Sequence, residues 1–448
     1  MDWHWGNAAA TDAAFAAAAH VVSQRIDNHR IVTNPMEPRG AVGSYDAANG
    51  RYTLVVSSQN IHGNRDATAR ALGVPPADVR FIAPDVGGGF GAKNFTYAEH
   101  ALILWAAKRV GRPVKWIATR SEGFVSDHQA RDHQADASLA LDADGKFLAL
   151  RVSSVANIGA YMAGGAGAVQ TNQYVHLQGG IYTIPAIALH VVTVLSNTTP
   201  IGVTRGPGFA EAVNVIERLI DAAARQCGFD RADLRRSNMV PAAAMPMTNA
   251  LGFSVDSGNF AQTFDRALEV ADVAGFALRR AESNARGMLR GLGFVYHIKG
   301  TGGSPHENVD IRFESDGTLS LITGTQTIGQ GHETTFPQIL ADRLGIPNAV
   351  IRLRQGDTDL IRPAAVMAVR ARPTWAAPRS GAHPRRSCGR ACRSPPMRSR
   401  PRKPTSFSPM GTSLSSAPIA RSRCWTSLRG HARLARRSTP ITRGRAST

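Results

Sequence analysis

Three glycine-rich segments carry the residues whose types and spacing suit chemistry. They are Asp85-Val-Gly-Gly-Gly-Phe-Gly-Ala-Lys93, Gly202-Val-Thr-Arg-Gly-Pro-Gly208 and Gly324-Thr-Gln-Thr-Ile-Gly-Gln-Gly-His332. Glycines let the backbone approach a ligand closely, and backbone N–H groups at a helix start favour an anionic group such as a phosphate. The bulky Phe90 inside the first loop is unusual for a plain turn and suggests a wall beside a bound group. The pattern therefore indicates a site for an anionic ligand.

Two familiar phosphate-binding motifs offer alternatives for the first loop. A P-loop requires Gly-x4-Gly-Lys-Ser/Thr, and the segment Ala92-Lys-Asn94 does not fit that pattern. A dinucleotide-binding fingerprint fits better, because Gly87-x-Gly89-x-x-Ala92 follows a predicted strand and Glu122 follows the next one. However, no regular alternation of strands and helices surrounds the loop, and Phe90 intrudes. The dinucleotide interpretation is therefore disfavoured.

Each candidate residue also has an ordinary structural interpretation. Phe90 can be a core residue, and Arg205 can be a solvent-facing turn residue between glycines. His332 can be a structural histidine at a helix start, and Gln59 one more polar strand end. Their joint occurrence on or beside three glycine loops favours one ligand site over four unrelated structural roles.

The elements that must position the loops are strands and helices in mixed order, which predicts an α+β (mixed α/β) fold. A strand at Val79–Val86 enters the first loop, and a helix follows it to about Arg109. A long amphipathic helix at Ala210–Gln226 follows the second loop, and a helix at Thr334–Leu344 follows the third. Elsewhere we expect an alanine-rich helix over 8–24, a glycine-rich loop lining something buried over 159–180, a strand over 291–299 and a hairpin over 308–323.

The positive charge is concentrated at the C-terminal end. The chain has 448 residues and a net charge of +19, but residues 361–448 hold 20 Lys and Arg and no Asp or Glu. The first 360 residues therefore hold 32 basic and 33 acidic residues, and are close to neutral. This distribution argues against a nucleic-acid-binding role for the main body.

The basic segment has no helical or strand periodicity, a single lysine (Lys403), and many Arg, Pro and Ser residues. One interpretation is a polybasic arm for nucleic acid or anionic lipid. The other, which we favour, is translation of GC-rich codons in a shifted frame, giving a disordered tail without a function of its own. We therefore predict a first domain at 1–245, the start of a second at 246–360 and a frameshift-derived tail at 361–448.

Targeting and cysteine signals are weak. The first residues, Met1-Asp-Trp-His-Trp5, lack a basic region followed by an apolar run, and the alanine-rich stretch is too short to span a bilayer. Cys388 and Cys392 form a lone C-x3-C without a partner pair. We expect a cytoplasmic protein without a disulfide framework, a zinc site or a membrane partner.

The motifs together resemble a known family. Asp85–Lys93, with Ser57-Ser-Gln-Asn60 upstream and Arg205-Gly-Pro-Gly208 and Gly329-Gln-Gly-His332 downstream, resembles the molybdopterin-binding large subunit of the xanthine dehydrogenase family. The branch is that of bacterial carbon monoxide dehydrogenase-like and aldehyde or isoquinoline oxidoreductase-like proteins. The resemblance covers about residues 1–360 in the family's order and spacing.

The resemblance implies a molybdenum–molybdopterin cofactor, in bacteria usually the cytosine dinucleotide form, and hydroxylation of an electrophilic carbon with oxygen from water. It implies that no protein side chain ligates the metal. Gln59 would hydrogen-bond the apical oxo ligand, while Phe90 and the backbone of Gly89 and Gly91 would flank the metal. The remaining implied cofactor contacts are Arg205, beside the cofactor, and Gln330, Gly331 and His332, at the pterin or its phosphates.

Positions at which the sequence departs from the family pattern narrow the class of substrate that we expect. The copper-binding Cys of the carbon monoxide enzymes corresponds to Arg205, so carbon monoxide is disfavoured. Asn94 stands where the purine enzymes have Glu, and Gln173 and Pro207 fall at their second substrate-binding Arg and stacking Phe. These three positions form the implied substrate pocket, and they favour an aldehyde or an N-heterocycle over xanthine.

The resemblance also implies what the chain lacks and what it assembles with. The family's general-base Glu lies in a glycine-rich motif near the C-terminus, and no such motif occurs here, so we expect no catalytic residue to be retained and a truncated, catalytically incomplete copy. The implied partners are an FAD-binding medium subunit and a 2Fe-2S small subunit, with a small-molecule substrate. The alternative is a non-catalytic nucleic-acid or membrane-binding protein acting through the basic tail.

Overall fold

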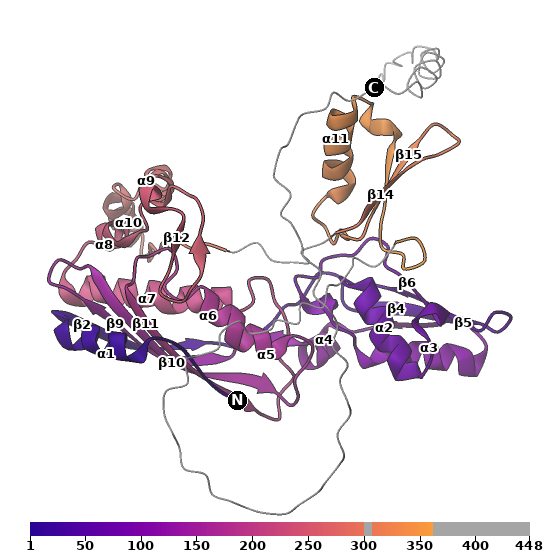
Figure 1. Ribbon diagram of the computed structural model, residues 1–448, viewed down its shortest axis with the longest axis horizontal. Helices are drawn as coiled ribbons and strands as arrows, with labels where there is room; N and C mark the ends of the chain where they lie inside the picture. Colours follow the sequence, from indigo (N-terminus) through magenta and orange to yellow (C-terminus); the bar gives the residue numbers. More distant parts are fainter. Residues whose placement is uncertain (300–306, 362–448) are drawn as a thin grey trace, which may run out of the picture. The chain divides into compact units, whose positions relative to one another are not determined.

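The computed structural model describes residues 1–299 and 307–361 (Figure 1). Helices and strands alternate irregularly along this part of the chain, which confirms the predicted mixed α/β class. By backbone contacts all described residues except Phe313–Thr318 belong to one unit. The basic segment beyond residue 361, for which we predicted a disordered tail, lies outside the described residues. No helix in the described ranges is both long and apolar enough to cross a membrane.

A five-stranded sheet forms the first layer of the fold. Its order is β1, β11, β10, β9, β2, with β10 and β11 parallel and the other neighbours antiparallel. Side chains on β10 alternate between buried and exposed positions, as expected for a strand with one face on a core. The strands are β1 (Asp2–Gly6), β2 (His20–Asn28), β9 (His133–Leu141), β10 (Phe147–Gly159) and β11 (Ala186–Leu195).

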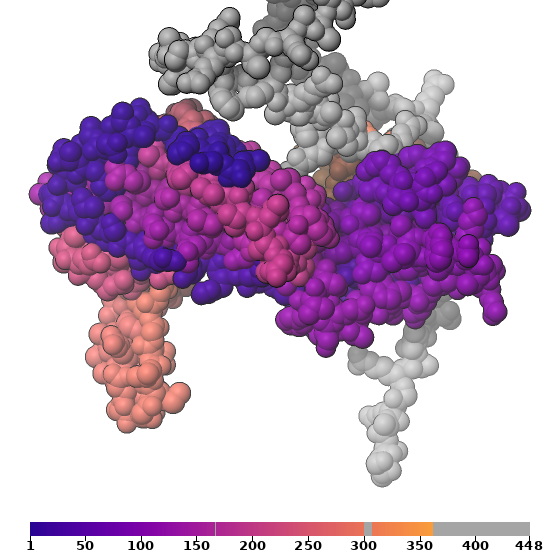
Figure 2. Space-filling model, turned by 90° about the horizontal axis from the view of Figure 1, so that it is seen from below, coloured from indigo at the N-terminus to yellow at the C-terminus, as the bar shows by residue number. Residues whose placement is uncertain are grey.

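Helices pack against this sheet. α1 (Ala8–Ala17) places Ala14 and Phe15 against small buried alanines of the strands. α7 (Phe209–Cys227) buries Val215, Leu219 and other apolar residues in the largest core cluster. Figure 1 shows α1 and α7 on opposite sides of the sheet, and Figure 2 shows the N-terminal residues in indigo exposed on the side that it views.

A four-stranded sheet carries the first glycine loop. Its order is β6, β5, β4, β7, with β5 and β6 parallel and the other pairs antiparallel. Helices α2 and α3 pack on it, and Leu54, Phe81 and Leu104 are fully buried in its core. The elements are β4 (Gly40–Asp46), β5 (Arg51–Val56), α2 (Ile61–Leu72), β6 (Val79–Ile82), α3 (Ala98–Val110) and β7 (Val114–Ile117).

A three-stranded sheet with one helix carries the third glycine loop. Its order is β14, β15, β16, and α11 packs on it over a small core that includes Leu319, Leu321 and Ile351. Past β16, Asp357 forms a 2.6 Å ion pair with Arg80 of β6, so this part of the chain returns to the four-stranded sheet. The elements are β14 (Val309–Phe313), β15 (Leu319–Thr323), α11 (His332–Leu344) and β16 (Ile351–Arg354).

Shorter elements connect these layers. They are β3 (Ile31–Val32), η1 (Pro76–Asp78), η2 (Ala92–Asn94), α4 (Arg120–Ser126), β8 (Gln129–Ala130), α5 (Ala166–Ala168), the π-helical η3 (Val169–Gln173), α6 (Tyr174–His176), α8 (Arg231–Asn238), η4 (Ala242–Ala244), β12 (Met247–Thr248), β13 (Ser254–Val255), α9 (Phe260–Val270), α10 (Phe276–Ala285) and η5 (Asn348–Val350).

Four expected elements differ in the structure. The strand predicted over 79–86 is shorter and ends at Ile82. The alanine-rich helix ends at Ala17, and His20–Asn28 is a strand because it pairs along its whole length with β9. The segment 159–180 is not a simple loop, since it contains three short helical turns. The segment 291–299 alternates between exposed and half-buried side chains, but it is not assigned as a strand. The predicted hairpin over 308–323 is confirmed as β14 and β15.

Candidate functional site

The first glycine loop has a backbone that most residues cannot adopt. Gly88, Phe90 and Gly91 all have positive φ, at 89°, 51° and 106°. A Cβ on Gly91 would lie 2.3 Å from the carbonyl oxygen of Val203, so only glycine fits there without movement. A non-glycine residue at positive φ is uncommon and often marks a functional position, which applies to Phe90.

Gln59 holds this loop in shape. Its Oε1 accepts hydrogen bonds from the backbone N–H of Gly91 at 2.9 Å and of Lys93 at 3.2 Å. Backbone N–H groups only donate, so the amide oxygen must face them and the NH₂ group must point the other way. That NH₂ group donates to no described residue, and Gln59 is one of the residues that line the cavity described below. Gln59 therefore presents a free donor beside Phe90.

The second loop is fixed to the first. The backbone N–H of Arg205 donates to the carbonyl oxygen of Phe90 at 2.8 Å. Arg131 donates to the carbonyl oxygens of Arg205 and Gly206 at 2.9 and 3.1 Å, and it pairs with Glu211 at 3.1 Å. Glu211 is completely buried, and burial raises its pKa although Arg131 partly offsets the effect. Arg131 was not predicted from the sequence, because no neighbouring residue indicates that it donates to carbonyl groups about 75 positions further along the chain.

The third loop begins α11. Gly329 and Gly331 have φ of 114° and 79°, and a Cβ on either would meet no atom within 4 Å, so the loop surface is open there. Gln330 folds back, and its Oε1 accepts a hydrogen bond from the backbone N–H of Ile328. The ring of His332 stacks on Phe336, with centroids 4.3 Å apart. The first N–H groups of α11 thus adjoin an open glycine-rich surface, as an anion site requires.

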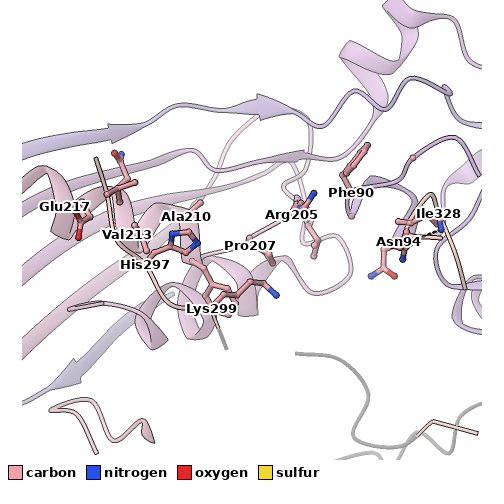
Figure 3. A pocket seen from close by; sticks show the side chains of 18 of the residues that line it. Phe90, Asn94, Arg205, Pro207, Ala210, Val213, Glu217, His297, Lys299 and Ile328 are labelled. Atoms are coloured by element: carbon pink, nitrogen blue, oxygen red, sulfur yellow. Dashed lines mark hydrogen bonds between the residues drawn. The ribbon is translucent and has the colours of Figure 1, made fainter. Parts of the chain in front are cut away.

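One cavity of about 1950 Å³ meets all three loops. Of the eleven predicted site residues, seven line it, namely Gln59, Phe90, Gly91, Asn94, Arg205, Pro207 and Gln330. Figure 3 shows Phe90 and Asn94 toward one end, Val213, Glu217 and His297 toward the other, and Arg205 and Pro207 between them.

The other four predicted residues are not in the cavity lining. Gly89 lies behind Gln59, because a Cβ on it would sit 2.3 Å from the Gln59 Oε1 atom. Gly331 and His332 lie next to Gln330 in the third loop. Gln173 ends η3, where its backbone touches Gly208 of the second loop and its buried Oε1 has no hydrogen-bond partner. The roles predicted for all eleven residues stay predictions.

The far end of the cavity contains ionised groups that the sequence did not single out. Arg235 is fully buried and pairs with Glu217 at 2.8 Å and with Asp221 at 2.9 Å. Burial raises the pKa of Glu217, and Arg235 partly offsets this effect. Burial opposes ionisation of Asp221, but Arg231 and Arg235 outweigh it and keep the Asp221 pKa below its ordinary value. Both carboxylates therefore form ion pairs with arginines.

The donor set of the cavity suits an extended anionic cofactor. The lining includes the Gln59 amide, the cations Arg205, Arg218 and Lys299, and the glycine loops that leave room for close approach. Arg205 and Arg218 form no ion pair with any described residue, so their charges are available to a ligand. Grouped His, Cys, Asp or Glu side chains able to ligate a metal are not found at this cavity within the described ranges. The donors and cations present thus fit a large anionic group.

Comparison with known proteins agrees with this geometry. Residues 1–239 and 266–374 match two family models, each described as a molybdopterin cofactor-binding domain. The chain is 36% identical over 373 residues to the carbon monoxide dehydrogenase large chain of Hydrogenophaga pseudoflava, covering 80% of this chain and 46% of that one. It is 31% identical to the nicotine 6-hydroxylase large subunit of Paenarthrobacter nicotinovorans, covering 77% and 44%.

Solved structures give the same result. The quinoline 2-oxidoreductase of Pseudomonas putida 86 superposes with a TM-score of 0.75 at 33% identity, covering 80% of this chain and 47% of that one. The carbon monoxide dehydrogenase of Oligotropha carboxidovorans gives 0.73 at 32%, covering 81% and 47%. This chain belongs to the molybdopterin-binding large-subunit family of the xanthine and carbon monoxide dehydrogenases. It spans about half the length of the curated relatives that it matches.

Proposed function

We propose that this chain is the cofactor-binding portion of a molybdenum hydroxylase large subunit. The single observation that carries the proposal is the fixed orientation of Gln59. Two backbone donors hold its oxygen, which leaves the NH₂ group of a cavity-lining residue free to donate to a ligand. A donor held in advance costs little ordering free energy when an anionic or oxo group binds.

In this proposal each loop has a different task. Gln59 would donate a hydrogen bond to the cofactor, while Phe90 and the backbone of Gly89 and Gly91 would flank its metal. Arg205 would lie beside the cofactor, and Gln330, Gly331 and His332 would hold the pterin or its phosphates, in the cytosine dinucleotide form. When bound, the cofactor would supply the two-electron redox chemistry of the hydroxylation.

The substrate we propose is an aldehyde or an N-heterocycle, bound near Asn94, Gln173 and Pro207. Nicotine and quinoline, after which two of the relatives are named, are N-heterocycles. Carbon monoxide is disfavoured, because the carbon monoxide enzymes use a copper-binding Cys. Cys227, the one cysteine among the described residues, does not line the cavity.

We further propose that this chain binds the cofactor without completing turnover. A general base must accept a proton, but the cavity carboxylates Glu217 and Asp221 are both paired with arginines. Loss of a general base typically lowers the rate about 100- to 10,000-fold. For the complete enzyme we propose an FAD-binding subunit and a 2Fe-2S subunit as electron acceptors, and a cytoplasmic location.

The test is cofactor loading. The full chain is expressed in a host that makes the molybdopterin cofactor, and bound molybdenum and pterin are measured beside a Gln59→Glu variant. We expect molybdenum and pterin in equal amounts in the parent chain and a severalfold lower content in the variant. A parent chain without pterin under these conditions would overturn the proposal. Tight binding of DNA that weakens steeply with salt would instead support the alternative function of the basic segment.

A further inference from the structure

Three potential metal ligands meet on the exposed face of the five-stranded sheet, away from the cavity residues. Asp2 and His4 are two positions apart on β1, so their side chains emerge on the same face. His190 of β11 lies directly opposite His4 in the antiparallel register. The pairing thus places two imidazoles and one carboxylate together from distant parts of the sequence.

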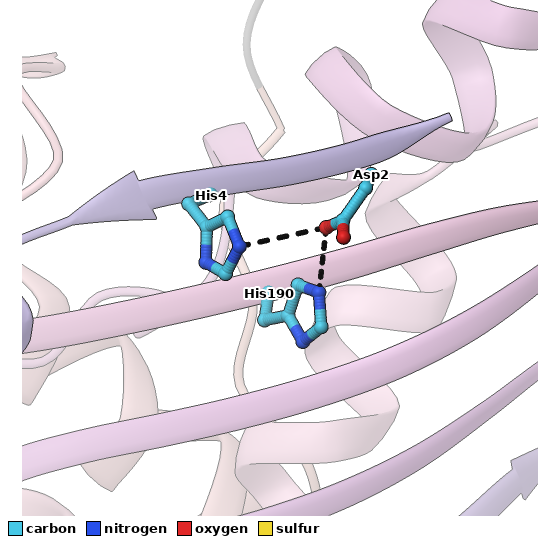
Figure 4. A group of neighbouring side chains, drawn as sticks. All are labelled: Asp2, His4 and His190. Carbon is cyan, nitrogen blue, oxygen red and sulfur yellow. Dashed lines mark hydrogen bonds and ion pairs between the residues drawn. The ribbon is translucent and has the colours of Figure 1, made fainter. Parts of the chain in front are cut away.

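The side chains converge on one point (Figure 4). The Nε2 atom of His190 lies 2.7 Å from Oδ1 of Asp2, and Nε2 of His4 lies 3.5 Å from the same oxygen. The two rings are parallel, with centroids 4.3 Å apart. The three ligand atoms all lie within 4.8 Å of one another.

We propose that Asp2, His4 and His190 bind a divalent transition-metal ion of the Zn²⁺ class. Zinc is bound by His nitrogen and Asp oxygen at about 2.0–2.2 Å, which places neighbouring donors in a tetrahedral site about 3.3 Å apart. The distances of 2.7 and 3.5 Å bracket that spacing, so small side-chain rotations suffice. Asp2 and His4 are exposed and His190 is half-buried, so the side chains have room to make these rotations, and the solvent side leaves a coordination position for water.

A neighbouring hydroxyl supports the required tautomer of His190. Ser153 Oγ lies 3.5 Å from Nδ1 of His190, at the limit of hydrogen-bond distance. A proton on Nδ1, directed to Ser153, leaves the lone pair of Nε2 for the metal. Such an outer hydrogen bond is common for metal-binding histidines. Binding of the metal at Nε2 therefore replaces the Nε2···Asp2 hydrogen bond of the metal-free state, with the single imidazole proton held on Nδ1.

The test uses Co²⁺ as a spectroscopic probe and Zn²⁺ as competitor, on the full chain without a histidine tag. We expect the parent to bind one more equivalent of Co²⁺ than the His4→Ala/His190→Ala double variant, and Zn²⁺ to displace it. The Asp2→Asn variant should bind at least about 10-fold more weakly. His29→Ala, at an exposed histidine outside the cluster, should behave as the parent.

Circular dichroism checks that the variants fold. We expect them to fold, because Asp2 and His4 are exposed and His190 is half-buried. Zn²⁺ should also raise the melting temperature of the parent but not of the double variant, because a ligand bound only to the folded state stabilises it. Equal Co²⁺ stoichiometry and affinity in the parent and the double variant would overturn the proposal. So would a parent cobalt spectrum dominated by thiolate charge transfer, which would assign the ion to cysteines.

Discussion

The side-chain oxygen of Gln59 lies 2.9 Å from the backbone nitrogen of Gly91, and this contact joins the end of one strand to the loop after another. A second bond to the nitrogen of Lys93 makes the oxygen a two-fold acceptor. The amide therefore has two separable functions. Its oxygen shapes the loop, and its NH₂ group remains for a ligand.

Two substitutions at Gln59 separate these functions. In Gln59→Glu, a carboxylate oxygen still accepts from Gly91 and Lys93, so thermal stability should change little, but the donor is lost and pterin content should fall severalfold. In Gln59→Ala, both backbone donors lose their acceptor, and the free energy of unfolding should fall by about 1–3 kcal/mol. Thermal melts and pterin assays on both variants check this. Equal pterin content in Gln59→Glu and the parent would contradict a donor role.

Gly91 and Gly73 form a matched pair for measuring loop strain. Both have positive φ, but a Cβ on Gly73 meets open space, whereas one on Gly91 meets the carbonyl of Val203 at 2.3 Å. Gly73→Ala should therefore cost only about 1 kcal/mol, the usual penalty of a left-handed residue. Gly91→Ala should cost about 3 kcal/mol or more, because the loop must move. Urea denaturation measures both, and similar costs would show that the loop relaxes without strain.

Local sequence patterns predicted the elements whose partners are close in sequence. The amphipathic helix predicted over 210–226 corresponds to α7 (Phe209–Cys227). The alanine-rich helix was predicted to extend too far, because the strand character of His20–Asn28 depends on pairing with β9, more than 100 residues away. In 291–299 the alternation is real, since Phe294, Tyr296 and Ile298 pack against the core, but alternation alone does not supply a hydrogen-bonded neighbour.

The residues of the candidate site also fall into two groups, those that the sequence indicated and those that only the folded structure brings together. Glycine spacing and the position of Phe90 led to the prediction of a ligand loop, and Gln59 was added through the family resemblance, while their ligand-binding roles stay predictions. Arg131, which holds the second loop, is recognisable only once Arg205 and Gly206 come beside it in space. The paired carboxylates at the far end of the cavity were also beyond sequence reasoning, because ordinary surface residues of a helix show the same pattern.

Arg131 is predicted to contribute strongly to stability, because it neutralises the buried carboxylate of Glu211. Arg131→Met leaves the fully buried Glu211 without its cation, and such a loss typically costs about 3–5 kcal/mol. Glu211→Gln in the same chain removes the uncompensated charge, so the double variant should regain part of that stability. Urea midpoints of the parent, both single variants and the double variant give the coupling. Strictly additive effects would argue that the two residues act independently.

Three buried histidines predict loss of stability in mild acid. Burial lowers the pKa values of His100, His128 and His133 to about 4, and the Nδ1 atom of each is buried without a hydrogen-bond partner. In the unfolded chain the pKa of each histidine is near the ordinary value of about 6.5. Between about pH 4 and pH 6.5 the unfolded chain therefore binds more protons than the folded chain. Stability should therefore be fully present above about pH 6.5 and be lost as the pH falls toward 4, by about 2–3 kcal/mol per histidine.

A single variant isolates one histidine from the carboxylates that titrate in the same range. Glu211 and Glu217 have raised pKa values, so their protonation favours the folded state as the pH falls and opposes the histidine effect. The difference between His100→Leu and the parent cancels these contributions, because both chains contain the same carboxylates. Urea midpoints between pH 7.5 and 4.5 should show a shallower loss in His100→Leu, while the exposed control His29→Gln should follow the parent. An identical slope in His100→Leu would mean that His100 takes up no proton on unfolding, contrary to its burial beside Phe81 and Tyr97.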